Sequence, residues 1–157
     1  MGNLITAIAG FIFASRGTFD LGLFIALTFG ISAVMASACV FNNYIDREID
    51  AKMARTKNRS FASGDINVAS GLIFGTVLIL VGSLIIILLV NAVTFGLGVI
   101  AYVNYIVFYG IAKRKSIHGT LVGTISGAVP LAAGYTAVIG KFDKIAITLF
   151  VIMVLWV

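Results

Sequence analysis

Three oxygen-bearing side chains recur at four-residue spacing where a long uncharged segment of the sequence ends. Residues 21–41 contain no charged side chain, and Asn42, Asp46 and Asp50 follow directly. In a helix, positions four apart differ by only about 40° in direction, so these three side chains share one stripe. Carboxylate and amide oxygens are ligands that Mg²⁺ takes from proteins, while phosphate oxygens fill its remaining positions. The spacing therefore predicts a metal site, with Asp46, Asp50 and Asn42 as Mg²⁺ ligands and catalytic residues.

Positively charged side chains stand close to this stripe and, later, at the end of another apolar segment. Arg55 and Arg59 repeat the four-residue spacing, and guanidinium groups bind phosphate oxygens in pairs. Lys113 and Arg114 begin a second basic cluster, which is expected on the same side of the membrane. We predict that these four residues bind a diphosphate group. The alternative is that they only orient the chain in the membrane, as basic residues beside membrane segments commonly do.

Glu48 lies between the two aspartates in the sequence but off their stripe. Its four-residue spacing to Lys52, with the acidic residue first, favours an ion pair on the helix surface. We therefore expect Glu48 to support the helix and to take no part in the metal site.

Two tyrosines, Tyr105 and Tyr109, lie about one helical turn apart in the apolar segment before the second basic cluster. Their rings could line a cavity and shield a carbocation through the negative π face. The alternative is a belt of aromatic residues at the membrane interface. A Mg²⁺–diphosphate site beside an apolar neighbourhood suited to a lipid tail points to an enzyme that acts on a prenyl diphosphate.

The composition places these residues in a membrane protein. Of the 157 residues, 61% are hydrophobic and 11% are charged, whereas soluble domains carry about 25% charged residues. The net charge of +5 does not indicate nucleic-acid binding, because the basic residues lie in short loops between apolar segments. Cys39 is the single cysteine, which excludes a disulfide or a cysteine-based metal site within the chain.

Six apolar segments can be recognised, at residues 4–14, 21–41, 68–90, 93–112, 119–139 and 145–157. The four middle segments reach the roughly 20 residues that a membrane-spanning helix needs, and the first and last are shorter. Gly119, Gly123 and Gly127 form a small face on which another helix could pack closely. We expect an all-α, polytopic transmembrane bundle of about six helices, the first and last incomplete, in which residues 1–157 form the N-terminal part of a single domain.

The loops differ in charge across the expected membrane. Eight of the 11 basic residues lie in residues 47–67 and 113–118, and Arg16, Lys141 and Lys144 lie in the opposite loops. Short loops rich in Lys and Arg stay on the cytoplasmic side. This asymmetry predicts that the acidic stripe faces the cytoplasm.

Several short stretches occur in a defined order: NNYIDREIDAKM at 42–53, RTKNR at 55–59, KR at 113–114 with Ser116 and Gly119-Thr120, and GTISGAVP at 123–130 followed by Gly134-Tyr135. Together with the N-x-x-x-D-x-x-x-D pattern, they resemble the intramembrane aromatic prenyltransferase superfamily. Within it, the chain is most similar to the protohaem IX farnesyltransferases, also called haem O synthases. The resemblance covers nearly the whole chain.

This resemblance implies an enzyme that uses Mg²⁺ to transfer a farnesyl group from farnesyl diphosphate to a vinyl group of haem b, giving haem o. It also implies a helical bundle around a cavity open to the lipid bilayer, where two acidic motifs face each other. The second motif would follow the sixth apolar segment, so we expect the 157 residues alone to be inactive. The implied location is the bacterial or mitochondrial inner membrane, with the acidic stripe on the cytoplasmic or matrix side and with haem A synthase or terminal-oxidase assembly factors as partners.

Two other functions remain open. A polyprenyltransferase acting on 4-hydroxybenzoate or another quinone precursor would share the acidic motif. Half of an ion-coupled membrane transporter could instead use Asp46 and Asp50 as a cation site. Transporter sites usually lie near the membrane midplane on broken helices, whereas this stripe is expected at the interface and is followed by arginines.

Overall fold

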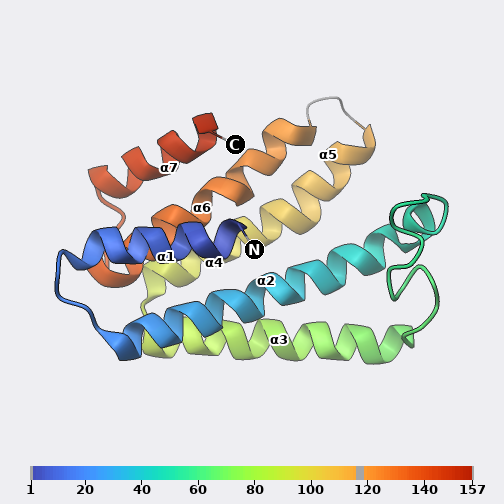
Figure 1. The fold of residues 1–157 in the computed structure, drawn as a ribbon, viewed down its shortest axis with the longest axis horizontal. Coiled ribbons are helices and arrows are strands. Elements are labelled where there is room, and N and C mark those ends of the chain that lie inside the picture. The colour runs from blue at the N-terminus through green and yellow to red at the C-terminus, as the bar shows by residue number, and fades with distance from the viewer. Residues whose placement is uncertain (1, 116–118, 157) are drawn as a thin grey trace.

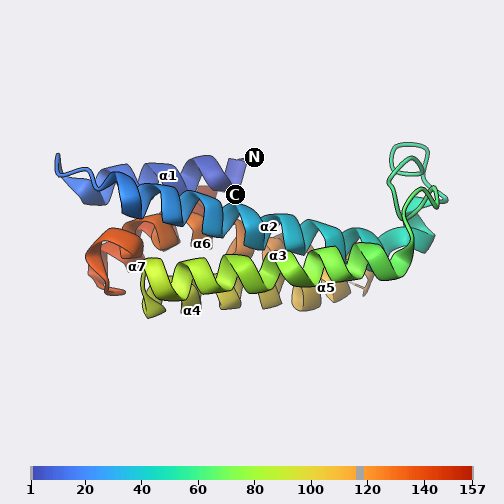
Figure 2. The same ribbon diagram turned by 90° about the horizontal axis from the view of Figure 1, so that it is seen from below.

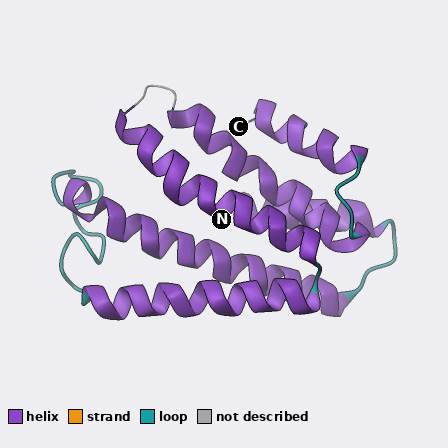
Figure 3. Ribbon diagram, turned by 180° about the vertical axis from the view of Figure 1, so that it is seen from behind, coloured by secondary structure: helices purple, strands orange, loops and turns teal. Residues whose placement is uncertain are grey.

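Helices make up most of the computed structural model, which describes residues 2–115 and 119–156 without the side chains of Arg114, Lys115 and Thr120. In chain order the elements are α1 (Gly2–Ser15), α2 (Leu21–Asp50), α3 (Val68–Leu89), α4 (Ala92–Val103), the π-helix η1 (Asn104–Tyr109), α5 (Gly110–Lys115), α6 (Gly119–Ile139) and α7 (Lys144–Trp156). Figure 3 shows that the described parts outside these elements are connecting loops. The expected all-α class is confirmed.

Four helical stretches are long and apolar enough to cross a membrane: Leu21–Asp50, Val68–Leu89, Ala92–Lys113 and Leu121–Ile139. They correspond to the four middle apolar segments of the sequence, and α1 and α7 are the two shorter helices. The third stretch consists of α4, η1 and α5, which follow one another without a break. Large apolar side chains such as Phe74 and Leu88 are exposed on α3, as expected for a helix that faces lipid.

Polar residues fix where several helices begin. The Asp20 carboxylate accepts a hydrogen bond from the Leu23 N–H at 2.9 Å at the start of α2. Asn67 does the same for α3 through the Ala69 N–H at 2.9 Å. Such N-cap contacts satisfy backbone donors that the first helical turn leaves unpaired. They define the first residues of α2 and α3. The two helices lie side by side as a long antiparallel pair (Figure 2).

A second pair is formed by α1 and α6, which lie side by side although they are far apart in the sequence (Figure 1). Two glycines allow their backbones to touch. A Cβ atom on Gly134 would lie 1.9 Å from the carbonyl oxygen of Ala7, and one on Gly10 would lie 2.1 Å from that of Leu131. Real Cβ atoms do not approach other atoms so closely. The packing of α1 on α6 therefore requires the absence of a side chain at both positions.

The hydrophobic core lies where these two pairs meet. Phe11 of α1 is fully buried, and it belongs to one cluster with Leu27 and Ile31 of α2 and Ile86 of α3. Gly119 and Gly123 pack as the small face predicted from the sequence. Their Cβ positions would lie 3.0 Å from the Cα of Lys113 and 3.2 Å from the Tyr109 ring. Thus α6 holds η1 and α5 in place, and these elements carry residues of the site described below.

Asp143 joins the end of α6 to the start of α7. Its Oδ1 accepts hydrogen bonds from the backbone N–H groups of Ile145 and Ala146, both at 3.0 Å, and its Oδ2 accepts one from the Tyr135 hydroxyl at 2.9 Å. The Ala146 N–H is the largest of the causes that hold the pKa of Asp143 below its usual value. The ionised carboxylate therefore stabilises the fold above its usual pKa, and this contribution is lost as the pH falls through the lowered pKa.

We expect Asp143→Ala to lower the melting temperature of the detergent-solubilised protein at neutral pH, because α7 loses its capping oxygen. Asp143→Asn retains a capping oxygen without the charge, so its melting temperature should lie between those of the wild-type protein and Asp143→Ala. In a series of melts at decreasing acidic pH, the difference between the wild-type and Asp143→Asn proteins should shrink as the carboxylate is protonated. A difference that stays constant with pH would argue against a role for the charge.

The loop at residues 51–67 and the loop at residues 140–143 lie at opposite ends of the bundle (Figure 1). With Cys39 replaced by alanine, we expect a single cysteine at position 57 to react with a membrane-impermeant maleimide only from the cytoplasmic or matrix side. A cysteine at position 142 should react only from the other side, because basic loops are retained on the cytoplasmic side. Labelling of both positions from one side would show that the number of spans between them is wrong.

Candidate functional site

The last turns of α2 bring two of the predicted ligands to one point beside α5. Lys113 of α5 donates from its Nζ to the Oδ1 of Asn42 at 2.9 Å and also to the Oδ2 of Asp46. The Asp46 residue is only 7% exposed, and the Lys113 ammonium lies 5.4 Å from the centre of the Tyr109 ring. A carboxylate buried at this depth needs a compensating charge, and Lys113 provides one from a distant part of the sequence.

Asp50 lies one turn further along α2 and faces the loop that follows the helix. Its Oδ2 accepts a hydrogen bond from Arg59 at 2.8 Å, and its side chain is almost fully buried. The Thr56 hydroxyl donates to the Asp50 carbonyl at 3.3 Å, so the loop folds back over the helix end. Among the side chains that the structure describes, Lys113 thus contacts the inner part of the acidic stripe and Arg59 contacts its outer part.

The other predicted phosphate-binding residues are placed differently. Arg55 is exposed and forms no ion pair with the residues that the structure describes. Arg114 belongs to α5, but its side chain lies outside the described part of the chain. The structure thus brings Lys113 and Arg59 to the acidic stripe and leaves Arg55 at the surface of the loop.

Glu48 points away from this cluster, as its position off the stripe predicts. It is exposed, and its Oε1 pairs with the Nη2 of Arg47 at 3.4 Å. This contact corrects the expected pairing with Lys52. The reason is that the Arg47 guanidinium lies over the Tyr44 ring, 4.4 Å from its centre, and donates to the Tyr44 carbonyl at 3.0 Å, which holds it close to Glu48.

The donor set of the stripe fits a hard cation. Among the described residues, no three side chains of the His, Cys, Asp and Glu types come together as a metal site. However, Asn42 and Asp46 already direct an amide oxygen and a carboxylate oxygen at one cationic group, the ammonium of Lys113. Two such oxygens suit Mg²⁺, which takes few protein ligands and shares the rest with phosphate. Asp50 faces Arg59 in this structure, and the roles of Asn42, Asp46 and Asp50 as metal ligands stay predictions.

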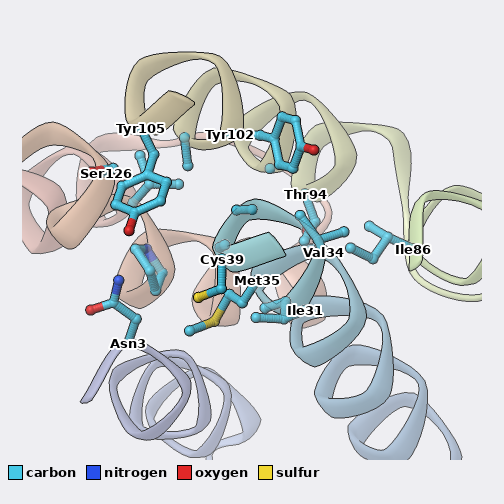
Figure 4. A pocket seen from close by; sticks show the side chains of 16 residues that line it. Asn3, Ile31, Val34, Met35, Cys39, Ile86, Thr94, Tyr102, Tyr105 and Ser126 are labelled. Atoms are coloured by element: carbon cyan, nitrogen blue, oxygen red, sulfur yellow. The ribbon is translucent and has the colours of Figure 1, made fainter. Parts of the chain in front are cut away.

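An apolar cavity of about 190 Å³ lies next to this cluster, between α1, α2, α6 and the rod made of α4 and η1. Ala38 and Cys39, which lie one turn before Asn42 on α2, are part of its lining. Figure 4 shows Tyr105 and Ser126 at one side of the cavity, and Val34 and Ile86 at the other. The cavity therefore runs from the neighbourhood of the acidic stripe into the apolar part of the bundle.

The two predicted tyrosines differ in their relation to this cavity. Tyr105 lines it, with its ring directed inward (Figure 4). Tyr109 stacks on Tyr105 with 5.7 Å between ring centres, but it packs against Gly123 and the Lys113 ammonium and is not among the lining residues. The stack thus connects the cavity to the cluster around Lys113.

Sequence reasoning missed two features of the site. Met35, Val34 and Ile31 line the cavity from α2, and their three- and four-residue spacing back from Ala38 was the available signal. The π-helix at Asn104–Tyr109 had no comparable signal. Such wide helical turns are rare and occur often at functional sites. Here the π-helix carries both Tyr105 and Tyr109.

Comparison with known proteins agrees with this geometry. The model of the UbiA prenyltransferase family matches residues 3–157. Proteins named protoheme IX farnesyltransferase are 47% identical in Yersinia enterocolitica and 48% identical in Yersinia pestis, each over 99% of this chain and 53% of the relative. The chain therefore spans about half the length of these curated relatives. The apo structure of a UbiA homolog from Aeropyrum pernix K1 has the same fold, with a TM-score of 0.76, 19% identity, and coverage of 99% of this chain and 58% of that one.

Proposed function

The chain belongs to the UbiA prenyltransferase family. We propose that it is part of an enzyme that transfers a farnesyl group from farnesyl diphosphate to a vinyl group of haem b. In this reaction the bond between C1 of the farnesyl group and the diphosphate oxygen breaks, and C1 bonds to the terminal vinyl carbon. Water adds its hydroxyl to the other vinyl carbon and releases a proton, which gives haem o. The curated relatives named protoheme IX farnesyltransferase support this choice of substrates.

The observation that carries the proposal is the meeting of Asn42, Asp46 and Lys113 beside an apolar cavity. A prenyl diphosphate has a strongly charged head and a long apolar tail. The head requires cations and metal ligands, and the tail requires space away from water. Both are present within two turns of α2, because Ala38 and Cys39 line the cavity and Asn42 and Asp46 follow them.

Asn42, Asp46 and Asp50 would hold Mg²⁺ in this proposal. When bound, the ion offsets the negative charge that grows on the leaving diphosphate. Lys113 and Arg59 already lie against the acidic stripe, so their side chains are close enough to donate hydrogen bonds to diphosphate oxygens once the substrate enters. They would exchange their contacts with the carboxylates for diphosphate oxygens as the substrate binds, and would then offset the negative charge that grows on the leaving group.

Tyr105 would act on the other side of the breaking bond. Its ring faces the cavity at the end near the acidic stripe, and Tyr109 stacks behind it. An aromatic face attracts positive charge, so Tyr105 would stabilise the allylic cation that forms on the farnesyl group. The apolar lining also excludes water from this cation before the vinyl group attacks.

The direct test uses the full-length form that the gene encodes, purified in detergent or nanodiscs. With haem b, farnesyl diphosphate and Mg²⁺, we expect haem o, identified by its mass. Loss of the product on addition of a chelator, and its return with Mg²⁺, would support the metal site. A protein that prenylates 4-hydroxybenzoate but leaves haem b unchanged would contradict the proposed acceptor. The transporter alternative has no support, since the matched family is one of prenyltransferases.

A further inference from the structure

The cavity beside the acidic stripe borders a second one. This second cavity, of about 120 Å³, is lined by residues of α2, α3 and α4, among them Ile79, Ser83 and Phe95. Four residues line both cavities: Val34, Ile86, Gly98 and Tyr102. They form a shared wall, which lies at the end of the first cavity away from Tyr105 (Figure 4).

Three members of the shared wall are held in place by their surroundings. Ile86 is only 2% exposed and belongs to the hydrophobic core. The Tyr102 hydroxyl lies 3.0 Å from the Ser37 hydroxyl, which in turn donates to the Gly75 carbonyl at 2.8 Å. Val34 packs so closely on α3 that a Cβ on Gly82 would lie 2.9 Å from its Cγ2. These contacts fix the positions of the three side chains in the wall.

Gly98 is the open part of this wall. A Cβ atom built on it would meet no atom within 4 Å, so the space in front of this glycine is empty. Its backbone is helical and does not require glycine for its conformation. Glycine also disfavours a helix relative to alanine. The missing side chain therefore has its main effect on the cavities, which stay wide at this position.

We propose that Gly98 sets the length of the prenyl chain that the site accepts. The proposal rests on the function proposed above, with the diphosphate at the acidic stripe. Val34 precedes Asn42 by eight residues on α2, which places the wall about 12 Å from Asn42 at 1.5 Å per residue. With carbon–carbon bonds of about 1.5 Å, the twelve-carbon main chain of an extended farnesyl group measures roughly 14 Å. Its last isoprene unit would therefore reach the shared wall, to which Gly98 belongs.

A side chain at position 98 would occupy the space of that last unit. A geranyl group is one unit shorter and ends before the wall, so it should still fit. The expected result of Gly98→Leu is a change in preference from farnesyl to geranyl diphosphate, with an intermediate change for Gly98→Ala. Since a Cβ atom at this position has no neighbour within 4 Å, both variants can fold without displacing other groups at that atom.

The experiment compares the full-length wild-type protein, Gly98→Ala, Gly98→Leu and Gly96→Leu. Gly96 is the matched control, because it lies on the same helix, its Cβ would also meet nothing within 4 Å, and it lines neither cavity. Binding of geranyl and farnesyl diphosphate in the presence of Mg²⁺ is measured by equilibrium dialysis, and transfer to haem b is measured as kcat/KM. For Gly98→Leu, we expect the affinity for farnesyl diphosphate divided by that for geranyl diphosphate to fall at least about tenfold, and we expect the same fall in the ratio of the two kcat/KM values. For Gly96→Leu the ratio should not change.

The two readouts separate this inference from the proposed function. The wild-type protein could form no haem o while Gly98→Leu still lowers the farnesyl-to-geranyl binding ratio. In that case haem b is not the acceptor, and the role of Gly98 stands. An unchanged ratio in Gly98→Leu overturns the role of Gly98, and so does an equal loss of both ligands. Melting temperatures show whether each variant is folded. Should Gly98→Leu not fold, Gly98→Ala, which adds a single methyl group, decides by the same ratio.

Discussion

Turnover of the full-length enzyme should fall by at least about a hundredfold when Asp46 is replaced by asparagine, since loss of one charge-stabilising group at a leaving group commonly costs this much. The structure gives the reason for choosing this residue. Its carboxylate is buried and shares the Lys113 ammonium with Asn42. The amide of Asp46→Asn has nearly the same shape but carries no charge to hold Mg²⁺. A loss of similar size is expected for Asp50→Asn, and initial rates of haem o formation measure both.

Glu48→Gln is the matched control for these variants. Glu48 lies on the same two turns of α2 and loses the same charge, but it is exposed and pairs with Arg47. Its replacement should leave the rate within about twofold of the wild type, in line with the small effects of surface ion pairs. Equal losses at all three positions would mean that the rate depends on the net charge of the helix end and not on the stripe.

Gly134→Ala should destabilise the protein strongly, by about 3 kcal/mol, the upper part of the usual range for overpacking. The new methyl group would lie 1.9 Å from the carbonyl oxygen of Ala7. This atom belongs to the backbone of α1, so no side-chain rotation can relieve the overlap and the two helices must separate. The melting temperature in detergent, or unfolding by a denaturing detergent, measures the effect. Gly10→Ala should act in the same way from the other helix.

Gly96→Ala provides the comparison for these glycine variants. Its Cβ would meet no atom within 4 Å, and alanine is the better helix former. We therefore expect its stability to equal or exceed that of the wild type. If Gly134→Ala and Gly96→Ala melted at the same temperature, the close approach of α1 to α6 would not contribute to stability.

Much of this fold can be predicted from the sequence, because membrane helices are encoded by long apolar runs. The segment at residues 119–139 coincides with α6, and the segment at 68–90 differs from α3 by one residue. The acidic stripe followed from spacing alone, since Asn42, Asp46 and Asp50 lie on one continuous helix. These features depend on residues close together in the chain, which sequence patterns describe well.

Features that depend on contacts between distant residues could not be predicted in the same way. The sequence offers four basic residues as partners of the stripe, and only the arrangement of α5 and the loop selects Lys113 for Asp46 and Arg59 for Asp50. Similarly, the repeated spacing of Gly119 and Gly123 indicated a packing face, whereas Gly10 and Gly134 are isolated glycines whose importance appears only when α1 lies on α6. Glycines in both sets pack, but only the first set has a pattern.

The π-helix at Asn104–Tyr109 sets the direction of the side chains that follow it on α5. Its hydrogen bonds join residues five apart, so it takes up one more residue per turn than an α-helix. If the same residues were wound as a regular α-helix, Lys113 would turn by about 100° and lose its direction toward Asn42 and Asp46. A relative with one residue fewer in this stretch could keep its lysine in place with an unbroken α-helix. The bulge therefore accommodates one residue more than a regular helix would hold there, while Lys113 keeps its direction toward Asn42 and Asp46.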